Sequence, residues 1–310
     1  MRILVLGAGA TGGYFGGRLA QAGADVTFLV RPARAALLRE RGLRIRSPLG
    51  DGDVTVALAT ADTLASLPAF DLVVLGCKAY DLDSAMDAVG PAIGPQTAIL
   101  PILNGLLHYD ALDARFGHER VLGGLCFISA TLGADGEVVH IGGPASITFG
   151  LRECNTDAGV LARLAAAFGA AGVDHLYAAD IARAQWIKFS FLAALAAGTC
   201  LMRGSVGAIV ASEGGEAFMA ALHEECLAVA AAEGQPVPDA EVRTARGHLT
   251  RTGSPVTASM LRDLQAGLRV EALQIVGDMV HRAHRNGLPV PRLEAAWAHL
   301  QAYGAGRTAR

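Results

Sequence analysis

One short segment near the start of the chain constrains the fold more than any other: Gly7-Ala8-Gly9-Ala10-Thr11-Gly12. It follows an apolar run at residues 3–6 and precedes a helical stretch at residues 13–22. In such a strand–loop–helix unit the first glycine allows a tight turn, the second lets a pyrophosphate approach the backbone, and the third lets helix and strand pack closely. The helix N-terminus then favours phosphate. The segment predicts a dinucleotide-binding domain. A plain strand–helix turn is the alternative, because the chain has 38 glycines.

The first half of the chain alternates apolar runs with helical stretches. Strands are expected over residues 3–6, 25–30, 54–59, 72–76 and 98–103, and helices over residues 13–22, 33–41 and 81–89. Continuous apolar runs suit a parallel sheet buried on both faces, and their alternation with helices predicts βαβ units. Further strands, some antiparallel, are expected over residues 122–132, 138–141 and 146–151. Pro101 cannot donate to a strand ladder, so the strand is expected to be kinked or partly unpaired there.

From about Asp180 onward the pattern is helical. Helical spacing covers residues 182–201, 213–233, 240–249, 257–265 and 270–286, and Gly234 and Gly287 stand where glycines end helices. We therefore expect an α/β protein with an N-terminal Rossmann-type, doubly wound sheet over residues 1–179. An all-helical domain would follow over residues 180–310, with a frayed tail from residue 304.

Composition excludes several classes of protein. Hydrophobic residues make up 52% and charged residues 18%, which is the opposite of a disordered chain. The net charge of −3 gives no basic excess for nucleic acid. Five dispersed cysteines without a CxxC pair, at positions 77, 126, 154, 200 and 226, fit a reducing cytosol better than a disulfide or zinc framework. The chain opens on a strand rather than a signal peptide, and the uncharged stretch 189–202 is shorter than the ~20 residues of a membrane span. We expect a cytoplasmic protein without membrane or nucleic-acid partners.

The end of the second expected strand indicates which dinucleotide is bound. NAD-binding domains place a carboxylate there to hold the ribose 2′-hydroxyl. This chain has no carboxylate at that place and instead carries Arg31, with Arg34 nearby. Guanidinium groups suit a 2′-phosphate, so NADP is favoured over NAD. The alternative is that Arg31 is a solvated loop residue.

Two polar groups follow strands at the edge where ligands of α/β sheets bind. Lys78 comes after residues 72–77, and Asn104-Gly105 after residues 99–103. Lys78 could be an ordinary surface lysine. Asn-Gly is common in hairpins, but a helical stretch rather than a returning strand follows Leu106.

The helical half contains a lysine on an apolar helix. Lys188 is the only charge between Arg183 and Arg203, and its helix face continues through Leu192 and Ala196. Such a lysine either extends to water, the more common outcome, or lies desolvated in a cleft, where a lowered pKa prepares it for proton transfer. Glu271 near a helix start and Ser259 have ordinary structural explanations as well. His281 and His284 share a helix, but neighbouring arginines and the lack of nearby cysteine argue against a metal site.

Together these residues resemble the ketopantoate reductase (2-dehydropantoate 2-reductase) family over nearly the whole chain. The most specific elements are the Trp-x-Lys and Ser-Met-x-x-Asp motifs. The segments that carry the resemblance are the glycine loop with Gly13-Tyr14, Arg31, Cys77-Lys78-Ala79-Tyr80, Asn104-Gly105-Leu106, Trp186-Ile187-Lys188-Phe189, Ser259-Met260-Leu261-Arg262-Asp263 and Arg269-Val270-Glu271.

The resemblance implies a 6-phosphogluconate-dehydrogenase-like fold and NADPH-dependent reduction of ketopantoate to pantoate in pantothenate biosynthesis. It implies that Lys188 is the general acid and that Asn104 contacts cofactor and substrate while holding Lys188 in place. Glu271 would accept a hydrogen bond from Lys188 or from the substrate hydroxyl. Ser259 would bind the substrate carboxylate, and Lys78 would lie beside the nicotinamide.

The chain departs from the family pattern at three positions. Established ketopantoate reductases resembling it carry polar groups where this chain has Leu192, Ala196 and Leu273. Fewer partners for substrate oxygens favour a more apolar 2-oxo acid as an alternative substrate, since unpaired buried oxygens cost ~1–3 kcal/mol each. A non-catalytic NADPH sensor is the third alternative, against which the joint presence of Lys188, Asn104 and Glu271 argues. The sequence leaves open whether the chain forms a homodimer and whether its halves close around the substrate.

Overall fold

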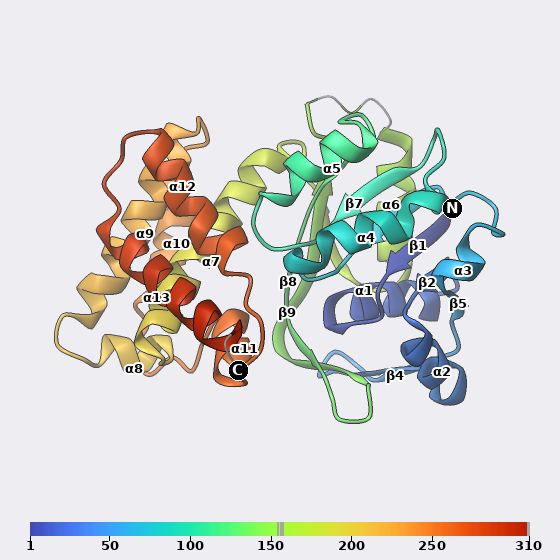
Figure 1. The fold of residues 1–310 in the computed structure, drawn as a ribbon, viewed down its shortest axis with the longest axis horizontal. Helices are drawn as coiled ribbons and strands as arrows, with labels where there is room; N and C mark the ends of the chain where they lie inside the picture. Colours follow the sequence, from blue (N-terminus) through green and yellow to red (C-terminus); the bar gives the residue numbers. More distant parts are fainter. Residues whose placement is uncertain (154, 156–157, 309–310) are drawn as a thin grey trace. The chain divides into compact units, whose positions relative to one another are not determined.

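The computed structural model describes residues 1–153, 155 and 158–308 and divides into two compact units (Figure 1). The first unit comprises Met1–Leu103 and His108–Ile181, and the second comprises Ala182–Arg310 together with Asn104–Leu107. The chain passes between units at Ile181, close to the expected residue 179. The assignment of Asn104–Leu107 to the helical unit was not foreseen from the sequence, which placed this segment in the first domain.

A parallel five-stranded sheet forms the centre of the first unit. Its order is β5-β2-β1-β6-β7, with β1 (Arg2–Leu6), β2 (Asp25–Leu29), β5 (Ala57–Ala59), β6 (Leu72–Leu75) and β7 (Ala98–Pro101). The chain winds first to one side of β1 and then, with β6, to the other, which makes the sheet doubly wound and puts the topological switch point at the carboxyl ends of β1 and β6. Pro101 is the last residue of β7, paired with Leu75, so the strand ends at the proline instead of kinking.

A second, mixed sheet has the order β10-β9-β3-β4, with β8 also paired to β9. Its strands are β3 (Leu43–Arg46), β4 (Gly52–Val54), β8 (Gly123–Leu132), β9 (Val138–Gly150) and β10 (Asp174–Tyr177). Residues 54–59, expected to form one strand, are split between β4 and β5 of different sheets. The two strands expected within residues 138–151 form the single strand β9, and β3 and β10 were not predicted.

Helix α1 (Ala10–Gln21) lies between the two sheets, and its glycines make this possible. A Cβ on Gly16 would come within 2.8 Å of the Phe28 ring in β2. A Cβ on Gly17 would come within 2.8 Å of Ile45 in β3. Side chains on either face of α1 would therefore push one of the sheets away, and the pair of glycines allows one core to include residues of both.

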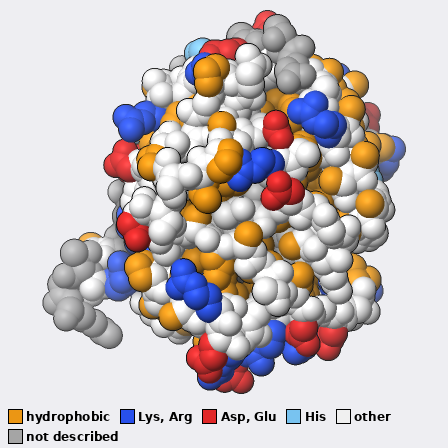
Figure 2. Space-filling view, turned by 90° about the vertical axis from the view of Figure 1, so that its right-hand side faces the viewer, with side chains coloured by type: hydrophobic (Ala, Val, Ile, Leu, Met, Phe, Trp, Pro, Cys, Tyr) orange, Lys and Arg blue, Asp and Glu red, His pale blue; other side chains and the backbone are white. Residues whose placement is uncertain are grey.

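The remaining helical segments of the first unit are short, and most of them connect strands. They are α2 (Pro32–Arg41), α3 (Ala61–Leu64), η1 (Ala79–Asp81), α4 (Leu82–Val89), η2 (Gly90–Ala92), α5 (His108–Phe116) and α6 (Ala158–Ala170). Figure 2 shows one face of the molecule, where acidic and basic side chains are interspersed among apolar ones, in keeping with the net charge of −3.

The second unit is helical throughout the part that the structure describes. Its segments are α7 (Ile181–Met202), α8 (Val206–Val210), α9 (Gly215–Ala232), α10 (Asp239–Leu249), α11 (Ser259–Gln265), the π-helical η3 (Leu273–Gly277), α12 (Asp278–Arg285) and α13 (Pro291–Thr308). Helix α13 was not predicted, and it continues through the tail that was expected to fray from residue 304. Gly234 and Gly287 end α9 and α12 with φ of +76° and +65°.

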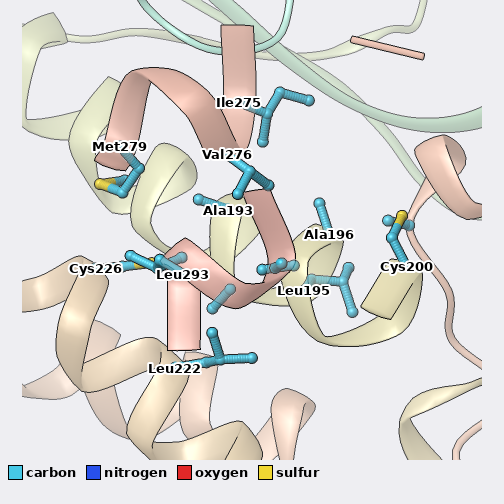
Figure 3. Packing of buried hydrophobic residues seen from close by; sticks show 14 of the residues in the cluster. Ala193, Leu195, Ala196, Cys200, Leu222, Cys226, Ile275, Val276, Met279 and Leu293 are labelled. Carbon is cyan, nitrogen blue, oxygen red and sulfur yellow. The ribbon is translucent and has the colours of Figure 1, made fainter. Parts of the chain in front are cut away.

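Helix α7 is the central element of this unit. Ala193, Ala196 and Cys200 of α7 belong to one hydrophobic cluster with Leu222 and Cys226 of α9, and Figure 3 shows Met279 and Leu293 in the same cluster. By length and composition alone α7 is apolar enough to cross a membrane, since it begins eight residues before the stretch 189–202 considered from the sequence. Because 72% of its apolar window is buried inside the protein, its surroundings are those of a core helix.

Candidate active site

The glycine loop joins β1 to α1 at the switch point of the parallel sheet. Gly7 has a φ of +83°, which an L side chain rarely adopts, and a Cβ on Gly12 would stand 2.6 Å from the Gly7 carbonyl oxygen. Gly9 is the N-cap residue of α1, and a Cβ added there would meet nothing within 4 Å. The loop is thus tight where the backbone turns and open at the helix N-terminus that carries Ala10 and Thr11. This geometry fits a pyrophosphate, held by backbone N–H groups.

Gly76 belongs to this arrangement, although sequence reasoning did not single it out. It directly follows β6, and a Cβ there would lie 3.2 Å from both N and Cα of Gly12. The end of β6 therefore approaches the glycine loop backbone to backbone. The signal in the sequence was a glycine immediately after a buried strand.

The two arginines expected near a 2′-phosphate have different environments. Arg31 is the N-cap residue of α2, its side chain is 83% exposed, and its guanidinium lies 3.9 Å from the Asp81 carboxylate. Arg34 instead donates from Nη2 to the carbonyl oxygen of Ala8 at 2.8 Å, and partial burial lowers its pKa. Arg34 therefore holds the backbone of the glycine loop through a hydrogen bond, whereas Arg31 is exposed at the end of β2.

Lys78 lies on the same edge of the sheet. It follows β6 by three residues, is half-buried, and is the N-cap residue of η1. Because β1 and β6 are parallel neighbours, their carboxyl ends meet at this edge, which brings Lys78 to the side of the sheet that carries the glycine loop.

The second unit brings Lys188 and Asn104 into direct contact. Lys188 lies on α7 and is only 7% exposed, so the expectation that it extends to water is wrong. Its Nζ donates to Asn104 Oδ1 at 3.0 Å. Asn104 reaches this position from the end of β7, and Gly105 continues in the left-handed region at φ +80° rather than forming a hairpin.

Glu271 and Ser259 lie in the same unit. Glu271 is 5% exposed and stands one residue before the helical turn that continues into η3, and Ser259 is the half-buried first residue of α11. A buried ammonium and a buried carboxylate in one small unit are unusual, since lysine and glutamate are almost never fully buried unless paired. The burial of both charged side chains makes this part of the unit a candidate functional site.

The apolar positions that depart from the family pattern are also placed. Leu192, one turn beyond Lys188, is half-buried, and Ala196, two turns beyond it, is fully buried. Leu273 is the first residue of η3, and 41% of its surface is exposed. The face of α7 that carries Lys188 therefore continues with hydrocarbon side chains.

The remaining reactive side chains of the described residues include four cysteines. Burial raises the pKa of the Cys200 thiol to about 12, which disfavours its reactive thiolate form. Cys154 lies outside the described residues. Within the described ranges, no group of three His, Cys, Asp or Glu side chains is arranged to hold a metal ion.

Comparison with known proteins places both units. The family model described as ketopantoate reductase PanE/ApbA matches residues 3–153, and the model of its C-terminal part matches residues 180–304. The uncharacterized oxidoreductase YkpB of Bacillus subtilis is 37% identical over 98% of this chain and 99% of its own. A 2-dehydropantoate 2-reductase of Halobacterium salinarum is 34% identical over 94% of this chain and 95% of its own.

Solved structures agree with the fold. The crystal structure of a 2-dehydropantoate 2-reductase from Geobacter metallireducens superposes with a TM-score of 0.88 at 30% identity, covering 97% of this chain and 99% of that one. A D-mandelate dehydrogenase, solved with NADH and anilino(oxo)acetate, has a TM-score of 0.86 at 20% identity over 99% of both chains, which is a likeness of fold.

Proposed function

The chain belongs to the ketopantoate reductase (PanE/ApbA) family of oxidoreductases, and from that premise we propose that it reduces a 2-oxo acid to a 2-hydroxy acid with NADPH. Ketopantoate is the first substrate to test, which would place the protein in cytoplasmic pantothenate biosynthesis. The observation that carries the proposal is the hydrogen bond from the buried Lys188 Nζ to Asn104 Oδ1 at 3.0 Å.

The first unit has the residues that would hold the cofactor. The loop from Gly7 to Gly12, including Ala8, Ala10 and Thr11, would bind the pyrophosphate through backbone N–H groups. Arg31 is the exposed cation suited to a 2′-phosphate, and Lys78 would lie near the nicotinamide. When bound, NADPH supplies the hydride.

The second unit has the residues that would handle the substrate oxygen. The Lys188 ammonium would stabilise the negative charge that develops on the keto oxygen and then give that oxygen a proton. Asn104 Oδ1 accepts from Nζ and so orients the ammonium. Glu271 would balance the buried positive charge or accept from the product hydroxyl, and Ser259 would hold the substrate carboxylate.

A second candidate keeps this chemistry and changes the substrate. Leu192, Ala196 and Leu273 favour a 2-oxo acid with an apolar side chain over hydroxylated ketopantoate, because they cannot hydrogen-bond its hydroxyl group. A D-mandelate dehydrogenase, solved with NADH and anilino(oxo)acetate, has the same fold. The support for an apolar substrate comes from Leu192, Ala196 and Leu273 of this chain.

Initial-rate measurements of NADPH oxidation decide between the candidates. Turnover of ketopantoate well above that of other acids supports the first. Preferential turnover of 2-oxoisovalerate or phenylglyoxylate supports the second. Tight NADPH binding without turnover of any acid would contradict both and leave a sensor.

Variants of Lys188 test the mechanism. Lys188→Ala should lower kcat by about 10²- to 10⁴-fold, the usual contribution of a positioned general acid, with NADPH affinity nearly unchanged. Lys188→Arg keeps the charge but cannot release a proton, so kcat should remain low. Ser190→Ala is the matched control, since Ser190 is buried on the same helix and bonds only to α7 carbonyls in the described structure. Full activity of Lys188→Ala would remove this residue from the chemistry.

A further inference from the structure

Gly105 follows Asn104 directly, and two independent features of its backbone require glycine. Its φ is +80°, in the left-handed region. A Cβ built there would collide with the carbonyl oxygen of Gln274 and lie 3.2 Å from its carbonyl carbon. Both residues belong to the second unit, so the segment Asn104–Leu107 lies on Gln274 with no room for a side chain at position 105.

Gln274 is the second residue of the π-helical segment η3, which begins two residues after Glu271. A π-helical turn is rare and is frequently found at functional sites. The opposite end of η3 is also held by a close contact, because a Cβ on Gly277 would stand 3.0 Å from the Trp297 ring of α13. The segment is therefore fixed between α13 on one side and the Asn104–Leu107 segment on the other.

We propose that Gly105 is a positioning residue, which allows the Asn104–Leu107 segment to lie directly on η3 and so keeps the Asn104 carboxamide at Lys188. The inference rests on the proposed function, in which Lys188 is the proton donor. A side chain at position 105 must displace either the segment or η3. Asn104 is the adjacent residue, and its bond to Nζ at 3.0 Å is lost once the distance exceeds about 3.5 Å.

The chain offers a matched control in the same unit. Gly287 has a φ of +65°, close to that of Gly105, but a Cβ there would meet nothing within 4 Å. Alanine at either position carries the strain of the left-handed region. Only at position 105 does it also meet a backbone atom, so the difference between Gly105→Ala and Gly287→Ala isolates the close approach.

Gly105→Asn separates the two reasons for glycine. Asparagine tolerates the left-handed region better than other L residues but still carries a Cβ. If the close approach to Gln274 matters, Gly105→Asn should be as defective as Gly105→Ala. If only the backbone angle matters, asparagine should restore wild-type behaviour, which would overturn the proposal. This variant also serves where Gly105→Ala does not fold.

The test uses two measurements on the whole chain. The first is kcat with the best 2-oxo acid. Both Gly105 variants should lower kcat at least tenfold and change its pH profile, while their affinity for NADPH stays within twofold of wild type. The activity of the control Gly287→Ala should also stay within twofold of wild type. The second is independent of turnover. Lys78 and Lys188 are the only lysines, so a sample labelled with ¹³Cε-lysine gives two signals. The Lys188 signal should shift in both Gly105 variants and in Asn104→Ala, and the Lys78 signal should not.

The outcomes separate this inference from the proposed function. If the wild type reduces no 2-oxo acid, the proposed function fails, and the lysine signals still decide whether Gly105 places Asn104 at Lys188. If folded Gly105 variants keep both the wild-type Lys188 signal and kcat, the inference is overturned whatever the substrate.

Discussion

A buried histidine in the helical unit leads to a quantitative prediction about pH. His223 on α9 is fully buried, and neither ring nitrogen has a hydrogen-bond partner within the described structure. Burial lowers its pKa from 6.5 to about 4, with repulsion from Arg246 adding to the effect and attraction to Glu224 opposing it. The fold therefore holds a neutral imidazole at neutral pH.

The sign follows from comparing the folded and unfolded chains. Between pH 6.5 and pH 4 the unfolded chain binds a proton at this ring and the folded chain does not, so acid favours unfolding. The stability is complete above pH 6.5 and declines as the pH falls toward 4. Since one unit of pKa difference is worth about 1.4 kcal/mol, the loss between pH 7.5 and pH 5 should be about 2 kcal/mol.

Urea unfolding followed by tryptophan fluorescence measures this loss in the correct unit, because Trp186 and Trp297 are the only tryptophans and both lie in the second unit. His223→Leu should remove about 2 kcal/mol of the pH dependence while changing stability little at pH 7.5. His281→Gln, an exposed position on α12, should retain the wild-type dependence. Equal losses of stability in wild type and His223→Leu between pH 7.5 and pH 5 would refute the reasoning.

Two further predictions concern the first unit. Arg31→Ala should weaken the binding of NADPH about tenfold or more, and that of NADH less than twofold, in a fluorescence titration. Arg39→Ala, at an exposed position on α2, should change neither affinity. Equal losses of affinity for both dinucleotides would contradict the proposed contact with the 2′-phosphate. Asp113→Ala removes the carboxylate that accepts hydrogen bonds from Arg152 Nη1 and Nη2 at 2.6 and 2.7 Å, and should lower the free energy of unfolding, measured by circular dichroism, by about 2–3 kcal/mol. The exposed Asp110→Ala on the same helix should cost less than about 0.5 kcal/mol; a comparable cost for both would show that the pair contributes little.

The parts of the fold that could be predicted are those whose local pattern reflects burial. The strands of the parallel sheet are apolar on consecutive residues because helices and a second sheet cover both faces. Strand β10 (Asp174–Tyr177) is largely exposed, so it has no apolar run to identify it. Helix α13 was not predicted, and its last residues, from Gly304, were expected to fray because chain ends are usually poorly ordered. Leu293, Ala296 and Leu300 bury one face of α13 in the core of the unit, and the helix continues beyond them to Thr308.

The candidate site shows the limit of local patterns more clearly. On α7 alone, a lysine within an apolar helix is best explained by a side chain that extends to water. The acceptor of its hydrogen bond, Asn104, lies 84 residues earlier in the chain. Asn104 comes next to Lys188 because the segment Asn104–Leu107 belongs to the second unit, although the residues on both sides of it belong to the first. Arg34 is similar, since its bond to Ala8 joins residues 26 apart. Of the features of the sequence, only the family resemblance connects Lys188 with Asn104.

Residue choice adds a physical reason to connect them. Only two of the 26 basic residues are lysines, Lys78 and Lys188, and the proposed function puts the first near the cofactor and the second at the substrate. All other basic residues are arginines. They include Arg152, which pairs with Asp113, and Arg34, which donates to the carbonyl oxygen of Ala8 in the glycine loop. A guanidinium holds its proton throughout the accessible pH range, whereas a buried ammonium can give its proton up. A protein that otherwise relies on arginine therefore keeps lysine at the position where the proposed reaction needs a proton to leave.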